Sequence, residues 1–253
     1  MQSHQHLAGP APRRFVQPYG PVPAPVWYLG LDLGKRQDHS ALVIFHLLWT
    51  PLDRCADTGD YLFTPPLTVR SIERFPLNTS YEDLPRIIAM RANQIGERHR
   101  TAHPHTAASI QLIIDAGGPG GPMVDRLRRI APGNLAIKPV IITAGSAETQ
   151  LPGGFSGIPR RALVTRLVQL VARGSLFCPA ALPNVSAWMS ELLGLSASGT
   201  RRNKSRGHDD LTMAAALAAW AAVKDAHELA PGTAPQCKNG PSSTFGLVDK
   251  RLF

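Results

Sequence analysis

Cysteine and long apolar runs are both scarce in this chain of 253 residues. The three cysteines, Cys55, Cys178 and Cys237, are odd in number and widely separated, which favours neither a disulfide framework nor a Cys-rich zinc site. No uninterrupted apolar run reaches transmembrane length, and residues 1–25 lack the apolar stretch that a signal peptide needs. We therefore expect reduced thiols, no membrane insertion and a cytoplasmic setting.

Acidic residues are also in deficit. The chain has 18 Asp and Glu against 27 Lys and Arg, so its formal net charge is +9 and its pI is near 10.0. This charge favours a polyanionic partner such as DNA, RNA or an anionic membrane surface, without choosing among them. A basic protein that is merely soluble has the same composition.

Composition changes at the two ends of the chain. Residues 1–25 are rich in proline, and residues 231–253 are rich in Gly, Pro, Ser and Thr, both of which disfavour a packed core. The 43% apolar content is enough for one sizeable core. We predict a disordered N-terminal tail over 1–25, one domain over 26–230 and a flexible C-terminal tail over 231–253.

The periodicity between these tails predicts an α/β domain. Strands are expected at 26–33, 40–48 and 67–75, with a loop between the second and third, and then at 109–115 and 135–143. Helices are expected at 81–98, 121–131, 159–173, 183–193 and 209–229. Three leading strands joined by short connections are most simply antiparallel, while the later strand-helix-strand units require parallel pairing. The result is a mixed sheet with helices on both faces.

Four aspartates hold conspicuous positions. Asp32 and Asp115 each end a mostly apolar run, and Asp209 and Asp210 open a long Ala-rich segment. Hard divalent cations such as Mg²⁺ prefer oxygen ligands, so a few carboxylates plus substrate phosphate oxygens make a sufficient site. Two such ions about 3.5–4 Å apart can activate water and stabilise the leaving oxygen of a phosphodiester. These acids are therefore candidate metal ligands, if the fold brings them together.

Each acid also has a purely structural interpretation. Asp115 has the right position to cap the glycine-rich turn 116–121. Asp209 and Asp210 suit the N-cap and first turn of a helix, where the helix dipole favours negative charge. Asp32 is harder to explain in this way, because it lies on a strand suited to burial and an unpaired buried carboxylate is costly.

The order of elements resembles the ribonuclease H-like fold. That resemblance implies a five-stranded sheet of order 3-2-1-4-5, in which the first and fourth strands are neighbours and Asp32 and Asp115 lie side by side. Four segments further resemble the nuclease domain of large terminase subunits from tailed bacteriophages, with the match spanning about 26–223. They are 30–44 (GLDLGKRQDHSALVI), 113–118 (IIDAGG), 158–164 (IPRRALV) and 207–218 (GHDDLTMAAALA).

This resemblance implies a divalent-metal-dependent endonuclease that acts on double-stranded DNA with two Mg²⁺ or Mn²⁺ ions. Asp32, Asp115 and one or both of Asp209 and Asp210 would be the catalytic metal ligands. Large terminases normally carry an ATPase motor, yet no Gly-x-x-x-x-Gly-Lys-Ser/Thr phosphate loop occurs here. We therefore expect either separate partners, namely an ATPase subunit, the small terminase subunit and the portal, or a freestanding or prophage-remnant nuclease domain in a bacterial cell.

Basic residues near these motifs are candidate DNA contacts. The stretch 151–210 has eight Lys or Arg against three acids, and its segment 196–207 ends two residues before Asp209. Such side chains hold phosphates without reading sequence, although an ordinary solvated loop has the same composition. Asp38 and His208 are candidate outer-shell groups. The candidate DNA-binding residues are Lys35, Arg36, Arg160, Arg161, Arg201, Arg202, Lys204 and Arg206.

Two other functions fit parts of the sequence. The segment 30–34 (GLDLG) resembles the first phosphate motif of actin-like and sugar-kinase-like ATPases, but those proteins repeat the fold and need a longer chain. A non-catalytic DNA-binding packaging protein could retain the same fold without turnover. Resolvases, transposases and ribonucleases H share the metal chemistry and remain alternatives among enzymes.

Overall fold

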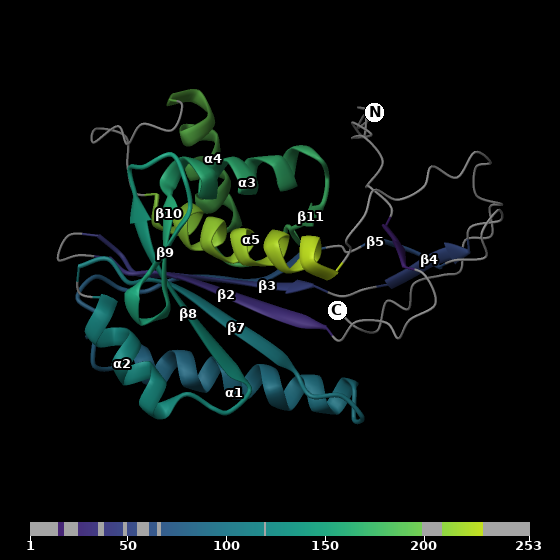
Figure 1. Cartoon of the computed structure of the whole chain (residues 1–253), viewed down its shortest axis with the longest axis horizontal. Helices are drawn as coiled ribbons and strands as arrows, with labels where there is room; N and C mark the ends of the chain where they lie inside the picture. Colours follow the sequence, from purple (N-terminus) through teal and green to yellow (C-terminus); the bar gives the residue numbers. More distant parts are fainter. Residues whose placement is uncertain are drawn as a thin grey trace.

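An eight-stranded mixed sheet forms the centre of the computed structural model, which describes residues 15–17, 25–34, 38–47, 50–54, 61–64, 67–118, 120–198 and 209–229 (Figure 1). In spatial order the strands are β11 (Leu176–Phe177), β6 (Leu67–Arg74), β3 (Ala41–Leu47), β2 (Val26–Asp32), β7 (Ser109–Asp115), β8 (Leu135–Thr143), β10 (Phe155–Pro159) and β9 (Thr149–Leu151).

The five predicted strands occupy the middle of this sheet in the expected order. Strand β3 pairs antiparallel with both β6 and β2, whereas β2, β7 and β8 run parallel to one another. Taken from β6 to β8, this is the order 3-2-1-4-5. The ribonuclease H-like topology expected from the sequence is therefore confirmed, including the adjacency of the first and fourth strands.

Several short strands were not predicted. Strands β9, β10 and β11 extend the sheet, and a 3₁₀ turn, η1 (Pro152–Gly154), joins β9 to β10. The expected loop between the second and third predicted strands contains β4 (Thr50–Arg54) and β5 (Tyr61–Thr64), which form a second sheet with β1 (Phe15–Gln17) from the expected N-terminal tail. These strands are short and lie among Pro and Gly residues, which weaken a local strand signal even where pairing stabilises the strand.

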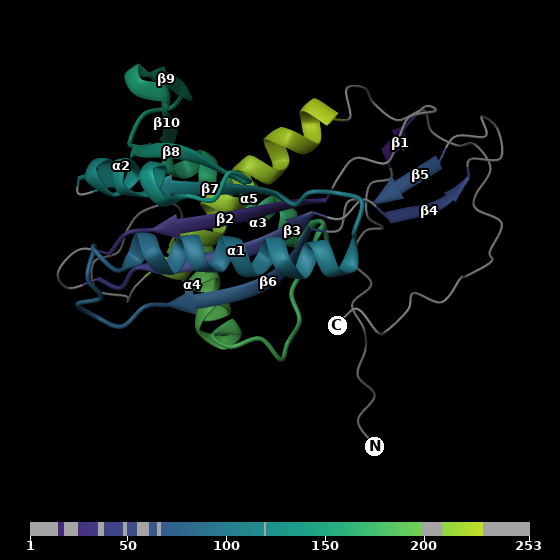
Figure 2. The same cartoon turned by 90° about the horizontal axis from the view of Figure 1, so that it is seen from below.

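Helices cover both faces of the large sheet. Helices α1 (Leu84–Ala102) and α2 (Gly120–Ile130) pack on one face; α3 (Arg160–Ala172), α4 (Val185–Ser198) and α5 (Asp210–Leu229) lie on the other (Figure 1). Figure 2 shows α1 lying along its face of the sheet, seen from below. None of the helices in the described parts of the chain is long and apolar enough to cross a bilayer.

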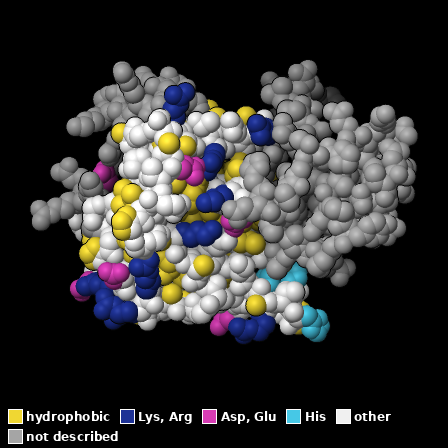
Figure 3. All heavy atoms as spheres, in the orientation of Figure 1, with side chains coloured by type: hydrophobic (Ala, Val, Ile, Leu, Met, Phe, Trp, Pro, Cys, Tyr) yellow, Lys and Arg dark blue, Asp and Glu magenta, His cyan; other side chains and the backbone are white. Residues whose placement is uncertain are grey.

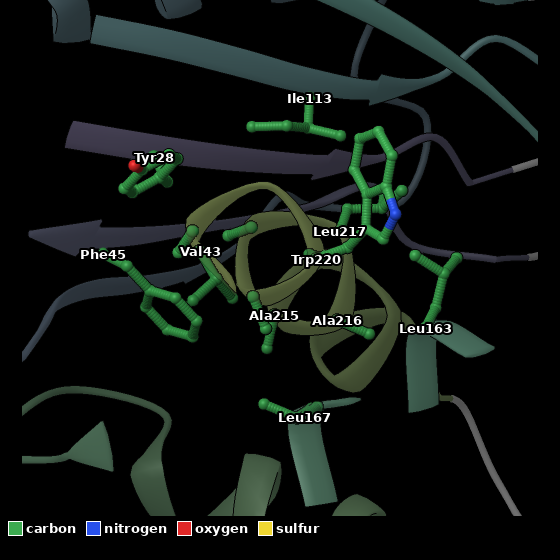
Figure 4. Packing of buried hydrophobic residues seen from close by; sticks show 14 of the residues in the cluster. Tyr28, Val43, Phe45, Ile113, Leu163, Leu167, Ala215, Ala216, Leu217 and Trp220 are labelled. Atoms are coloured by element: carbon green, nitrogen blue, oxygen red, sulfur yellow. The ribbon is translucent and has the colours of Figure 1, made fainter. Parts of the chain in front are cut away.

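Helix α5 is buried between the sheet and α3. Figure 4 shows it with Tyr28 and Ile113 of the sheet on one side and Leu163 and Leu167 of α3 on the other. The small alanines of α5 and Gly30 of β2 let the helix backbone approach the strand very closely. A Cβ added at Gly30 would lie only 1.9 Å from the carbonyl oxygen of Ala214. The Ala-rich composition of this segment therefore serves helix-on-sheet packing.

Candidate active site at the end of strands β2 and β7

Adjacent parallel strands carry the first two acids to one edge of the sheet. Asp32 is the last residue of β2 and Asp115 is the last residue of β7. The two strands are paired up to Leu31 and Ile114, which directly precede the two aspartates. Parallel strands end on the same side of a sheet, so Asp32 and Asp115 are neighbours.

Strand alternation directs both acids toward α5. On β2, Tyr28 belongs to the core under α5, and on β7 Ile113 does the same. Side chains two residues apart share a face of a strand, which places Asp32 and Asp115 on this same face. The acids therefore face the helix that carries the other predicted pair.

The N-terminus of α5 completes the group. Asp209 directly precedes the helix and Asp210 is its first residue, one turn before Ala214, the residue whose carbonyl packs on Gly30 of β2. Asp210 is 5% exposed. The direct contact between α5 and β2 thus brings the pair to the sheet edge.

Electrostatic interactions relate the other three acids to Asp32. The pKa of Asp32 is raised well above its usual value, first by burial and then by repulsion from Asp115, Asp210 and Asp209. The Arg160 guanidinium opposes this shift. The four candidate ligands, far apart in sequence, form one electrostatic cluster around Asp32.

Asp209 and Asp210 differ in their surroundings. The carboxylate of Asp209 accepts a hydrogen bond from Arg160, with which it forms an ion pair, and its backbone carbonyl accepts the first helical hydrogen bond, from the Met213 amide at 2.9 Å. The Thr212 amide, which an N-cap side chain often binds, instead donates to Oε2 of Glu191 at 2.9 Å. Asp209 therefore provides the backbone carbonyl of the N-cap, while the side chain that binds the Thr212 amide comes from another helix.

Asp115 does perform the structural role that its position suggested. Its Oδ1 accepts a hydrogen bond from the Gly117 amide at 2.9 Å, which stabilises the turn after β7. The same carboxylate repels Asp32. Turn capping and membership of the acidic cluster are thus compatible at this position.

Sequence reasoning missed three residues around the cluster. Glu191 of α4 forms an ion pair with Arg74 at the end of β6. Burial raises the pKa of Glu191 to about 7, against the lowering effects of the Thr212 amide and Arg74. Tyr81 donates its hydroxyl to the carbonyl of Gly34, and its pKa is raised by burial and by Asp32. No local pattern marks these residues, because all three depend on long-range contacts.

The remaining predicted residues divide into two groups. Arg160 lies at the cluster, its neighbour Arg161 is exposed, and Asp38 lies in the connection between β2 and β3. Figure 3 shows Lys and Arg mixed with Asp and Glu on one face, rather than one continuous basic surface among the coloured residues. The others lie outside the described residues: Lys35, Arg36, Arg201, Arg202, Lys204, Arg206 and His208.

The donor set fits a hard divalent cation by its chemistry, because every candidate ligand in it is a carboxylate. Within the described ranges, no three His, Cys, Asp or Glu side chains are placed closely enough to hold a metal ion as they stand. Carboxylates repel one another when no cation lies between them, and after burial this repulsion is what raises the pKa of Asp32. Metal binding would therefore require these carboxylates to come closer together.

The order and directions of the strands, with helices on both faces, define a ribonuclease H-like fold. No protein-family model matches the sequence, and no relative is found among curated proteins. Among solved structures, the fold is similar to the large terminase nuclease from thermophilic phage G20c, with 21% identity and a TM-score of 0.43 over 77% of this chain and 81% of that one.

The fold is also similar to the Mn-soaked terminase nuclease domain of human cytomegalovirus. Without inhibitor, that domain shares 11% identity with this chain, with a TM-score of 0.49 over 80% of this chain and 86% of that one. With inhibitor bound, the identity is 11% and the TM-score is 0.45, over 81% and 85%. The terminase resemblance noted in the sequence thus has a structural counterpart at low identity.

Proposed function

We propose that this protein is a divalent-metal-dependent endonuclease that hydrolyses phosphodiester bonds of double-stranded DNA. The observation that supports this most directly is the cluster of Asp32, Asp115, Asp209 and Asp210 at one edge of the sheet, where burial and then repulsion from the other three acids raise the pKa of Asp32. Such repulsion destabilises a folded protein unless a cation offsets it. A cluster of this kind therefore indicates a cation site.

Asp32, Asp115 and Asp210 are the proposed ligands, and Asp209 is the alternative to Asp210. Mg²⁺ or Mn²⁺, as a pair of ions, would supply Lewis acidity toward the phosphate and the attacking water. Asp32 and Asp115, at the ends of buried strands, would hold their carboxylates in fixed positions. Asp210 is the more buried of the helix pair, and Asp209 is bound to Arg160.

Basic residues support a polyanionic substrate. The whole chain carries a formal charge of +9 despite its acidic cluster. Arg160 and the exposed Arg161 begin α3 beside that cluster, where a guanidinium can bind a phosphate oxygen without reading the base sequence. Arg160 would then exchange its partner Asp209 for phosphate.

One glycine of the ATPase-like segment 30–34 has a packing role. The ATPase alternative rests on the resemblance of this segment to the first phosphate motif of actin-like and sugar-kinase-like ATPases. Gly30 instead lies under α5, where the Ala214 carbonyl would be 1.9 Å from an added Cβ. Helix packing explains the glycine without a nucleotide.

Incubation of the purified chain with supercoiled plasmid in Mg²⁺ or Mn²⁺ tests the proposal. We expect nicked and linear products, and we expect Asp32→Asn and Asp115→Asn to abolish them. Asp125→Asn is the matched control, because Asp125 is an exposed acid on α2 that pairs only peripherally with Arg128 at 3.8 Å.

Cleavage that persists in excess chelator, or that is equal in wild type and both cluster variants, would refute the proposal. DNA binding without any cleavage would favour the non-catalytic packaging protein. ATP hydrolysis that is lost in Asp32→Asn would favour the ATPase.

A further inference from the structure

Helix α5 receives a hydrogen bond at its N-terminus from a different helix. The first amides of a helix have no partner within it, and the side chain of the N-cap residue usually accepts from the second or third of them. Here the Asp209 carboxylate pairs with Arg160, while the amide of Thr212, the third residue of α5, donates to Glu191 Oε2 at 2.9 Å. Glu191 lies on α4 and is separated from Thr212 by 21 positions.

Arg74 holds Glu191 at the level of the acidic cluster. The two side chains form an ion pair in which Glu191 is only 8% exposed and Arg74 25% exposed. Arg74 is paired with Ala41 on β3, and Ala41 is paired with Asp32 on β2. Arg74 therefore lies two strand spacings from Asp32, about 10 Å across the same edge of the sheet.

These contacts form a continuous connection between the sheet edge and the first turn of α5. It runs from Arg74 to Glu191 and then to the Thr212 amide, two residues after Asp210. A buried carboxylate is a costly cap here, because burial disfavours the charge of Glu191 and Asp210 repels it. Breaking one partner of such a buried pair costs far more than replacing both partners by apolar groups.

We propose that Glu191, held by Arg74, is a positioning residue that orients the first turn of α5 so that Asp210 faces Asp32 and Asp115. The inference rests on the proposed metal-dependent function, since it assigns Glu191 a role through the metal-binding acids. Glu191 binds the backbone two residues away from the proposed ligand, and it is not itself a ligand.

Variants of Glu191 and one control variant distinguish a positioning role of Glu191 from a general effect on stability. Glu191→Ala removes both the cap and the ion pair. The double variant Glu191→Leu with Arg74→Met replaces the ion pair by apolar side chains of similar volume. It takes the place of Glu191→Ala if that variant does not fold. Glu148→Ala is the matched control, because Glu148 also pairs with an arginine, Arg166, and binds α5 through the Trp220 indole at 3.1 Å.

Trp220 lies ten residues beyond Asp210, about 15 Å along the helix. Glu148→Ala therefore weakens a contact of α5 at a point far from the proposed ligands.

Three measurements are made on each full-length variant: amide hydrogen exchange over 209–215, calorimetric titration with Mn²⁺ in the absence of DNA, and cleavage kinetics. In both Glu191 variants we expect faster exchange at Thr212, about 10–100-fold weaker Mn²⁺ binding, and a lower kcat at unchanged KM for DNA. Glu191→Gln, whose amide oxygen can still accept from Thr212, should recover part of the Mn²⁺ affinity. Glu148→Ala should bind Mn²⁺ like wild type.

Wild-type exchange at Thr212 together with wild-type Mn²⁺ affinity in the Glu191 variants would overturn the inference. An equal loss of affinity in Glu148→Ala would also overturn it, since the effect would then be one of stability alone. If wild type neither binds Mn²⁺ nor cuts DNA, the proposed function fails. The exchange measurement still decides the positioning role in that case, because faster exchange confined to the first turn of α5 supports it and unchanged exchange refutes it.

Discussion

Gly30 of β2 lies directly against α5, and Gly30→Ala tests whether that contact places Asp210. An added Cβ would lie 1.9 Å from the Ala214 carbonyl oxygen and 2.9 Å from the Ala218 amide nitrogen. Real Cβ atoms essentially never come closer than 3.0 Å to another heavy atom. The difference between 3.0 and 1.9 Å requires α5 to move away from β2 by about 1.1 Å at Ala214.

This displacement has two expected effects. Overpacking of a well-packed core typically costs 1–3 kcal/mol, so we expect the free energy of unfolding to fall by about that amount. Ala214 is one helical turn from Asp210, and a shift of about 1 Å in a catalytic group can lower a rate by about 100-fold. We therefore expect plasmid cleavage to fall by about 100-fold while the affinity for DNA is unchanged.

Urea unfolding and cleavage assays on the same preparations measure both effects. Gly194→Ala on α4 is the matched control, because a Cβ at Gly194 would meet nothing within 4 Å. Since alanine is favoured over glycine within a helix by about 1 kcal/mol, the control should be as stable as wild type or more so, with unchanged cleavage. A Gly30→Ala protein that unfolds and cleaves like wild type would refute the reasoning.

Three further predictions follow from the buried polar groups. Asp32→Asn removes a negative charge that burial and Asp115 disfavour. Without metal at pH 8, the variant should therefore melt at a higher temperature than wild type, and it should not cleave DNA. A lower melting temperature would contradict this. The folded pKa of Glu191, about 7, exceeds its ordinary value of 4.5, so its contribution to stability is lost as the pH rises through that range. In urea unfolding, the free energy of unfolding of Glu191→Gln should therefore rise relative to that of wild type by about 3 kcal/mol between pH 4.5 and pH 8. A difference that stays constant with pH would refute this. Tyr28→Phe removes the hydrogen bond to Asp225 at 3.0 Å and should lower the free energy of unfolding by about 1 kcal/mol without affecting cleavage.

Much of the fold could be predicted because its main elements have strong local signals. The expected boundaries of β7 and β8 agree with the structure, since each is an apolar run bounded by turn residues. The short strands β4, β5, β9 and β10 could not be predicted in this way. Their stability comes from pairing with partners, and their Pro and Gly residues disfavour strands locally.

The candidate site shows the same division. Asp32 and Asp115 could be predicted as candidate ligands because an acid at the end of a buried strand is unusual. Glu191 has no such signal, because it lies within a helix and its partner Arg74 is 117 positions away. Its role depends on a contact between α4, β6 and α5 that no local pattern encodes.

Sequence alone determined which segments are buried, where the strands end and which acids stand at those ends, because hydrophobic periodicity and strand length are local properties. Tertiary structure decided that the other three acids lie near enough to Asp32 to repel it, that Asp209 pairs with Arg160, and that a glutamate from α4 caps α5. These outcomes depend on how closely α5 approaches β2 at Gly30. That distance is set by the packing of helix and sheet against each other.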